Sequence, residues 1–216
     1  MDAQIIQKIA ISAIPVIFAI TLHEAAHGYA ALRFGDRTAW MLGRISLDPR
    51  KHIDPIGTLL MPALLLMLSS GSILFGYAKP VPVNFSQLRR PKQDMLWVAA
   101  AGPAANLVMA LGWAGLLKLS IVMPEFVYTE AVREMARAGI GINVSLMVLN
   151  LLPLPPLDGG RIMVSVLPIS LANSFSRIEP YGMYILFAML YFRILDLLMI
   201  PPMRFCLSLL SSIFAF

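Results

Sequence analysis

The stretch "IAISAIPVIFAITLHEAAHGYAALRF", residues 9–34, joins a long apolar run to a compact group of polar side chains. Residues 9–22 contain no charge at all, and His23, Glu24 and His27 follow closely. About 20 apolar residues in a helix are enough to cross a bilayer. Because an ionised side chain at that depth is costly, such residues mark functional sites. The stretch therefore predicts a first membrane helix that carries functional side chains.

The composition of the whole chain agrees with a membrane protein. Of its 216 residues, 58% are hydrophobic and 13% are charged. Soluble domains carry about 25% charged residues, so this chain has too little polar surface for water. We expect an all-α polytopic membrane protein with a single membrane-embedded domain, residues 1–216, whose core lies at about 5–165. Cys206 is the only cysteine, which excludes an intrachain disulfide and a thiol-rich metal site.

Apolar segments recur along the chain and predict five to six hydrophobic helical segments. Between the first two, "WMLGRISLDP" (40–49) alternates in polarity and predicts a short membrane-associated β-strand or hairpin. "KPVPVN" (79–84) is predicted to be extended, because alternate prolines remove donors and restrict the residues before them. Segment 56–75 contains Pro62 and a Ser-Ser-Gly-Ser break, so it either spans the membrane or re-enters it. The six segments lie at about 5–32, 56–75, 95–117, 139–157, 181–200 and 203–216, the last two forming a hydrophobic C-terminal region (181–216).

Basic residues predict the orientation of these segments. Loop 33–54 has five basic and three acidic residues, loop 76–94 has four basic and one acidic, and loop 118–138 is balanced. We expect both basic loops in the cytoplasm and the N-terminus outside, which puts the two histidines near the cytoplasmic end of their helix. The formal net charge of +5 then reflects an anionic membrane leaflet. No basic tract with interleaved aromatic residues indicates nucleic-acid binding.

The polar group at the end of the first helix has the spacing of a metal site. His23 and His27 are four residues apart, so a helix places both imidazoles on one face. One metal ion can accept a nitrogen from each, with Glu24 beside it. His-Glu-x-x-His is the pattern in which two histidines bind zinc and the carboxylate takes a proton from water. The alternative is an interfacial cluster whose side chains simply reach lipid headgroups.

A catalytic zinc ion needs a third protein ligand, and Asp158 is the best candidate. It lies in "NLLPLPPLDGGR" (150–161), where three prolines and two glycines break a helix in an apolar context. Irregular backbone at membrane depth is tolerated where it is buried in protein or lines a wet cavity. His52 lies in a basic loop, where a solvated or headgroup-contacting role is expected. Asp196 has Arg193 three residues before it as an ion-pair partner.

Two asparagines stand near these motifs. Asn106 lies in "AAGPAANL" (100–107), whose small residues permit close helix packing. Asn150 opens the broken segment. Either could bind an oxyanion or hold a substrate backbone, and the competing interpretation of each is an interhelical hydrogen bond.

Taken together, these motifs resemble the site-2 protease family of zinc intramembrane metalloproteases. The resemblance rests on "HEAAH" (23–27), "AKPVPVN" (78–84), "AAGPAAN" (100–106) and "NLLPLPPLDGG" (150–160), which occur in the family's order. It covers the chain from about 16 to 165. Larger relatives carry PDZ or CBS domains, so this sequence looks like a minimal member.

The resemblance implies roles for individual residues. His23, His27 and Asp158 would bind one zinc ion per chain, and Glu24 would be the general base. Residues that would contact the substrate or an oxyanion are Asn106, Asn150, Lys79, Pro80, Val81, Pro82, Val83 and Asn84.

The predicted function is zinc-dependent hydrolysis of peptide bonds in transmembrane segments, either in regulated intramembrane proteolysis or in clearance of membrane fragments. The partners would be a transmembrane protein or peptide substrate and membrane lipids, in the plasma membrane of a prokaryote, with the active site toward the cytoplasm. Alternatives are a non-catalytic relative that binds membrane proteins and a metal transporter. Another membrane zincin class would need a downstream Glu, and no Glu follows Glu24 in an apolar segment. The sequence leaves the substrate and the oligomeric state open.

Overall fold

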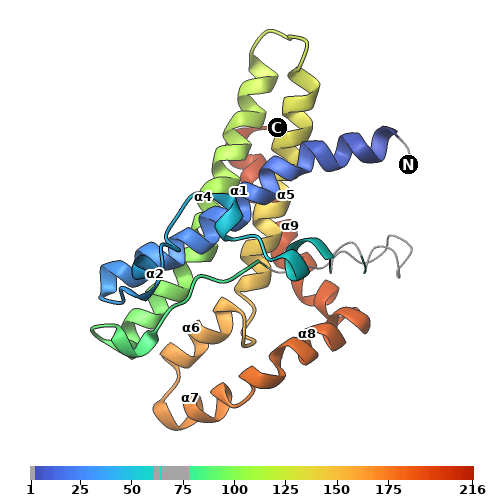
Figure 1. The fold of residues 1–216 in the computed structure, drawn as a ribbon. Helices are drawn as coiled ribbons and strands as arrows, with labels where there is room; N and C mark the ends of the chain where they lie inside the picture. Colours follow the sequence, from blue (N-terminus) through green and yellow to red (C-terminus); the bar gives the residue numbers. More distant parts are fainter. Residues whose placement is uncertain (1–2, 61–63, 65–77) are drawn as a thin grey trace.

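The computed structural model describes residues 3–60, 64 and 78–216 (Figure 1). Within these residues the chain forms helices and irregular segments, without a β-strand. The helices, in chain order, are α1 (Ala3–Phe34), α2 (Thr38–Met41), η1 (Pro49–Lys51), η2 (Pro55–Leu60), η3 (Phe85–Gln87), α4 (Pro91–Val122), α5 (Thr129–Asn150), α6 (Asp158–Val166), α7 (Ile169–Ser176), η4 (Glu179–Tyr181), α8 (Gly182–Tyr191) and α9 (Ile194–Phe214).

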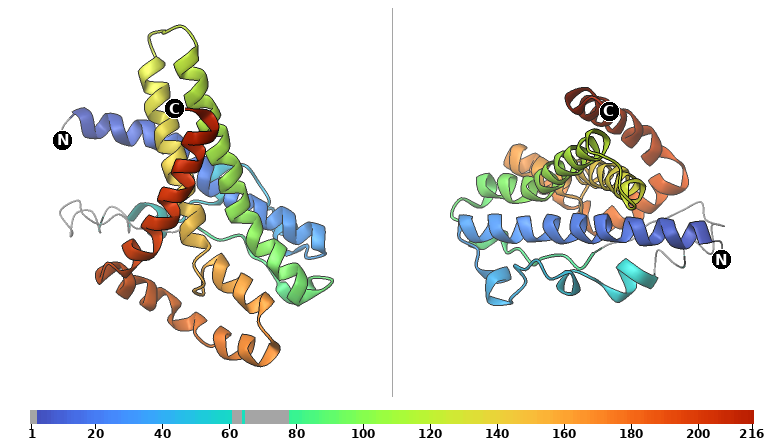
Figure 2. Two further views of the ribbon diagram at one scale, coloured as in Figure 1. Left: turned by 180° about the vertical axis from the view of Figure 1, so that it is seen from behind. Right: turned by 90° about the horizontal axis from the view of Figure 1, so that it is seen from above.

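Helices α4 and α5 form an antiparallel pair at the centre of the molecule (Figure 1). Their contact surface is built from small side chains, because Ala110, Ala114 and Ala136 are fully buried in it. A Cβ at Gly139 of α5 would collide with the indole ring of Trp113, so glycine is required for this close approach. Helix α1 crosses the pair on one side and α9 packs on the other (Figure 2).

Among the described helices, three are long and apolar enough to cross a membrane, namely residues Ala10–Phe34 of α1, all of α4 and all of α9. The expected five to six hydrophobic segments are therefore wrong. Segment 139–157 falls on α5, which begins earlier, at Thr129. Charged side chains occupy the first turns of α5 and pair with one another, which leaves too short an apolar stretch to span; they are Glu130, Arg133, Glu134 and Arg137.

The boundary between the two C-terminal helices also differs from the expectation. The sequence predicts segments 181–200 and 203–216 separated near Pro201, but α9 runs through Pro201 and Pro202. The break falls instead at Arg193, which has a left-handed φ of 58°. In apolar surroundings, neighbouring groups and local adjustment of the helix satisfy the backbone that prolines leave free.

The expected β-strand or hairpin at 40–49 is wrong as well. The carboxylate of Asp36 accepts the Thr38 N–H at 2.8 Å and starts the short helix α2, which a turn at Gly43 follows with a φ of 62°. Alternating polarity makes a strand only where a neighbouring strand supplies hydrogen bonds, and the described residues contain none. Whether segment 56–75 spans or re-enters the membrane depends mainly on residues outside the described part of the chain.

Candidate active site

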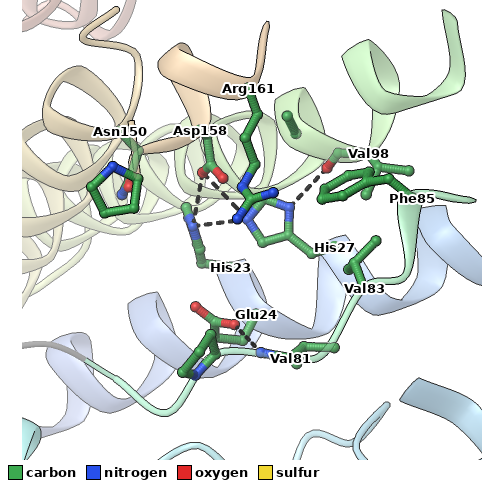
Figure 3. Close-up of a pocket in the computed structure, with 13 residues that line it drawn as sticks. His23, Glu24, His27, Val81, Val83, Phe85, Val98, Asn150, Asp158 and Arg161 are labelled. Carbon is green, nitrogen blue, oxygen red and sulfur yellow. Dashed lines mark hydrogen bonds and ion pairs between the residues drawn. The ribbon is translucent and has the colours of Figure 1, made fainter. Parts of the chain in front are cut away.

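His23 and His27 lie one turn apart on α1 and point toward the same neighbour. Their Nε2 atoms are 3.1 Å apart, and their rings meet edge to face. Asp158 reaches them as the first residue of α6, where its Oδ2 lies 3.2 Å from Nε2 of His23 and 3.3 Å from Nε2 of His27 (Figure 3). Within the described residues, these side chains are the one group of three that could hold a metal ion.

The broken segment after α5 delivers Asp158 to this cluster. Helix α5 ends at Asn150, the prolines that follow cannot continue it, and the chain turns back into α6. A Cβ at Gly159 would collide with the Leu151 and Leu152 backbone, and one at Gly160 with that of Pro155. The two glycines therefore let α6 begin directly against the irregular segment, which fixes the carboxylate beside the imidazoles.

Each imidazole uses its other nitrogen to bind a helix neighbour. Nδ1 of His27 donates to the carbonyl oxygen of Val98 at 2.8 Å, and Nδ1 of His23 donates to Oδ1 of Asn106 at 2.6 Å. The Asn106 amide nitrogen in turn donates to Asn143 at 3.0 Å. With the proton on Nδ1, each Nε2 presents a lone pair to the cluster. Hydrogen bonds of this kind orient histidines that bind metals.

The geometry of the cluster fits a zinc ion. Two Nε2 lone pairs and the buried Oδ2 of Asp158, which has no hydrogen-bond donor, face one another. Three acceptors in one place repel unless a metal ion, or a proton on one of them, lies between them. Ligands about 2.0–2.1 Å from a tetrahedral zinc ion are separated by about 3.3 Å. The three observed separations of 3.1, 3.2 and 3.3 Å agree with that value.

Gly102 of α4 leaves the space that the imidazoles occupy. A Cβ at this position would lie 2.6 Å from Cε1 and 2.7 Å from Nε2 of His23, and would collide with Nε2 of His27. Real Cβ atoms do not approach other atoms so closely. A larger residue in place of Gly102 would therefore displace the cluster or separate α4 from α1.

Glu24 does not point toward Asp158 as the two histidines do, but toward the backbone of Val81. Its Oε2 accepts the backbone N–H of Val81 at 2.7 Å (Figure 3). Val81 belongs to residues 79–84, the Pro-rich strap, which runs without helix or strand alongside α1. The Glu24 carboxylate and the extended backbone of the Pro-rich strap therefore lie side by side, next to the histidine cluster.

Hydrogen bonds to the loop after α1 hold the Pro-rich strap in place. Arg44 donates to the carbonyl oxygens of Lys79 and Pro80 at 3.1 and 3.2 Å. The Lys79 N–H donates to the carbonyl oxygen of His52 at 2.9 Å. His52 itself is fully buried, with Nε2 2.8 Å from the Ser46 carbonyl oxygen, so its expected solvated position is wrong. At the far end of the strap, the Asn84 N–H donates to the carboxylate of Asp36 at 2.7 Å.

A cavity of about 200 Å³ lies over the cluster. Its lining includes Asn150 and, from the strap, Pro80, Val81 and Val83 (Figure 3). Other residues singled out by sequence lie elsewhere: Asn106 is fully buried behind His23, and the cavity lining does not include Lys79, Pro82 or Asn84.

Sequence reasoning missed several residues of this site. Arg161 lines the cavity, with its guanidinium 4.8 Å from the ring centre of Phe85 and 3.0 Å from the Glu179 carboxylate. Asn143 is fully buried behind Asn106, and a polar residue in an apolar segment is a signal that could have found it. The role of the Val98 carbonyl could not be read from the sequence, because it is a backbone group.

The expected ion pair between Asp196 and Arg193 is absent from the described part of the chain.

Comparison with known proteins gives consistent matches. The model of "Peptidase family M50" matches residues 119–192. Over 193 residues the chain is 36% identical to "Putative zinc metalloprotease YwhC" of Bacillus subtilis, covering 88% of this chain and 84% of that protein. It is 34% identical over 145 residues to "Putative zinc metalloprotease Rip2" of Mycolicibacterium smegmatis, covering 66% of this chain and 52% of that protein. No solved structure matches the chain.

Proposed function

The chain belongs to peptidase family M50, the site-2 type of zinc intramembrane protease, and from this premise we propose that hydrolysis takes place at His23, Glu24, His27 and Asp158. The protein is an integral membrane hydrolase that acts on membrane proteins. The observation that carries the proposal is the convergence of three acceptor atoms, two Nε2 and one Oδ2, at 3.1 to 3.3 Å from one another.

His23, His27 and Asp158 would hold one zinc ion per chain. When bound there, zinc supplies a Lewis acid that polarises the scissile carbonyl and makes water more acidic. The chain contributes the fixed geometry, because the Val98 carbonyl and the Asn106 amide prevent the two imidazoles from rotating. His23, His27, Asp158 and Glu24 line one cavity, so water and a scissile carbonyl would reach a bound ion from that side.

Glu24 would be the general base. Its carboxylate lines the same cavity as the three ligands and lies on α1 beside His23. It would accept a proton from the water that attacks the carbonyl carbon and pass that proton to the leaving amine. The Val81 N–H holds Oε2 in position, which leaves Oε1 for the water.

The Pro-rich strap would hold the substrate in an extended form. A helical substrate hides its scissile carbonyl in its own hydrogen bonds, so it must be opened before cleavage. In an extended strap, the backbone N–H and C=O groups of Val81 and Val83 point to one edge. Those of Pro80 and Pro82 point to the opposite edge, which lacks N–H donors because both residues are prolines. Because the Val81 N–H is already bonded to Glu24, a strand of substrate would pair through the Val81 carbonyl and the backbone groups of Val83, at the edge that borders the cavity.

The two asparagines would have different roles. We propose that Asn150, which lines the cavity, binds the substrate backbone or the oxyanion. Asn106 would act through His23, since its amide is bonded to that imidazole and to Asn143.

The cluster joins α1 to α6 against α4, so we propose that the whole chain acts as a single domain. We further propose the plasma membrane of a prokaryote as its location, with the cluster toward the cytoplasm. Both loops with an excess of basic residues, 33–54 and 76–94, lie next to the ends of α1 and α4 that are nearest the cluster.

The test of this assignment compares Glu24→Gln with the unchanged protein. Both are purified in detergent, their zinc content is measured by mass spectrometry of the metal, and cleavage of a transmembrane peptide is followed. The variant should keep its zinc and lose at least a hundredfold in cleavage rate, because general bases contribute about 10²–10⁴-fold. Cleavage at the normal rate by Glu24→Gln would refute the assignment of the base.

A further inference from the structure

A second cavity lies where the C-terminal end of α1 meets the N-terminal end of α4. It has a volume of about 340 Å³ and is separate from the cavity over the histidines. Three arginines and one carboxylate supply its charge, and its lining consists of Arg33, Phe34, Arg89, Arg90 and Asp94. The ends of the two helices that form it lie side by side in the views of Figures 1 and 2.

The three guanidinium groups of this arginine cavity have no acidic partner among the described residues. Of the ion pairs in that part of the chain, none includes Arg33, Arg89 or Arg90. Asp94 forms no ion pair with them; it is buried, and its Oδ2 accepts the backbone N–H of Arg90 at 2.8 Å. Other arginines, such as Arg161 and Arg133, form ion pairs with carboxylates. With three guanidinium groups and one carboxylate in its lining, the cavity has an excess of two positive charges.

The walls of the arginine cavity are fixed by the backbone. The Arg89 N–H donates to the carbonyl oxygen of Phe34 at 3.0 Å, which ties the end of α1 to the residues before α4. Gly35 has a φ of +113°, a conformation that glycine adopts readily, and a Cβ there would lie 3.2 Å from Cγ of Arg89. The arginines are therefore held on a rigid frame, although their side chains are exposed.

The position of the arginine cavity suits the headgroup layer of a membrane. One candidate span ends at Phe34 and another begins at Pro91, so the cavity lies between the adjacent ends of two spans. Guanidinium groups bind phosphate oxygens through paired N–H donors, and the N-terminal end of a long helix such as α4 favours an anion. We propose that this cavity binds the phosphate group of an anionic phospholipid.

Binding there would act on the helices that carry the zinc ligands. Close to the cavity, Ala31 of α1 packs with Leu88 and with Val98, whose carbonyl accepts the His27 hydrogen bond. A phosphate that joins Arg33 to Arg89 and Arg90 therefore clamps α1 against α4 at the end next to His27. An anionic lipid should raise thermal stability, and it should do so whether or not the chain cleaves peptides.

The experiment measures the melting temperature of the zinc-loaded protein in detergent with three additives at equal phosphate concentration. These are phosphatidylglycerol, phosphatidylcholine and inorganic phosphate. Phosphatidylglycerol about a hundredfold above its dissociation constant should raise the melting temperature by on the order of 5 °C. Phosphatidylcholine should have little effect, since its own cation faces three arginines, and native mass spectrometry should find phosphatidylglycerol retained on the protein.

A pair of double variants locates the effect. Arg89→Gln with Arg90→Gln should abolish the shift and the retained lipid, whereas Arg177→Gln with Arg193→Gln removes the same charge elsewhere and should preserve both. An unchanged response in Arg89→Gln/Arg90→Gln, or an equal loss in both double variants, would overturn the proposal. A shift of the same size with inorganic phosphate alone would overturn the lipid as the source and assign the cavity to free phosphate. None of these outcomes depends on Glu24 or on proteolysis.

Discussion

At the scale of single residues, the histidines of α1 work through partners on α4. His23 and His27 donate from Nδ1 to Asn106 and Val98, and so keep Nε2 for the cluster with Asp158. The metal affinity of the site should therefore depend on residues that never touch the ion. Two substitutions on α4 test this dependence.

Asn106→Ala should lower zinc affinity about 10- to 100-fold, because His23 loses the acceptor that fixes its tautomer and its orientation. Asn106→Asp keeps an acceptor for the Nδ1 proton and should retain the affinity. Competition with a fluorescent zinc chelator measures both. Asn173→Ala, at an exposed position of α7, is the matched control and should bind zinc as the unchanged protein does. Normal zinc affinity in Asn106→Ala would contradict a positioning role.

Gly102→Ala should abolish zinc binding, because its Cβ would collide with the two imidazoles that we propose hold the ion. The same helix offers a control at Gly112, where a Cβ meets nothing within 4 Å. Alanine at either position raises helix propensity, so a difference between the two variants isolates the steric effect. Metal analysis of both proteins, with circular dichroism to verify folding, makes the comparison. Equal zinc content in the two variants would show that the cluster has room to shift.

The sequence predicted the cluster at this scale because charged and imidazole side chains are conspicuous in apolar segments. That pattern singles out His23, Glu24, His27 and Asp158 as candidates, and the structure brings the three predicted ligands within 3.1 to 3.3 Å of one another. The Val98 acceptor was not foreseeable, because every residue has a carbonyl. Arg161 directly follows the two glycines of the Asp158 motif in the sequence. Its place in the cavity lining, however, depends on how α6 packs against Phe85, which the sequence does not reveal.

At the scale of elements, the Pro-rich strap depends on the loop after α1. Alternating residues at 40–49 suggested a strand, yet the loop makes its contacts through individual side chains such as Arg44. A single sequence gives no information on whether a partner strand exists, which is why polarity alternation failed here. The extended form of 79–84 was foreseeable, because prolines restrict the backbone itself.

Arg44→Gln should detach the strap from its loop and lower cleavage while zinc content stays normal. Its guanidinium donates to the Lys79 and Pro80 carbonyls, and loss of such charge-assisted bonds at an exposed site should reduce kcat/KM roughly three- to tenfold. Arg50→Gln serves as the control, since Arg50 lies in the same loop and pairs with Asp48 alone. If both variants cleave a transmembrane peptide equally well, the strap does not position the substrate through Arg44.

At the scale of the whole molecule, apolar composition indicated the environment but not the division into helices. Runs of apolar residues do not reveal that α5 begins with a paired charge cluster or that α9 continues through Pro201 and Pro202. Both outcomes depend on neighbours. The charged side chains at the start of α5 form ion pairs with one another. The irregular backbone before Asp158 is covered by Gly182, where a Cβ would collide with Pro155.

Zinc should stabilise the whole molecule, because its proposed ligands join the first helix to α6. With the ion removed, two Nε2 lone pairs and the Asp158 carboxylate face one another without a cation, which favours separation of α6 from α1. We expect a chelator to lower the melting temperature by on the order of 5–10 °C and added zinc to restore it. His23→Ala should melt at a lower temperature from the outset and respond weakly to either treatment. A chelated protein that melts at the same temperature as the zinc-loaded one would mean that the three side chains do not bind zinc tightly enough to hold α6. Its place would then depend on its packing against α4 and against the irregular segment that Gly159 and Gly160 approach.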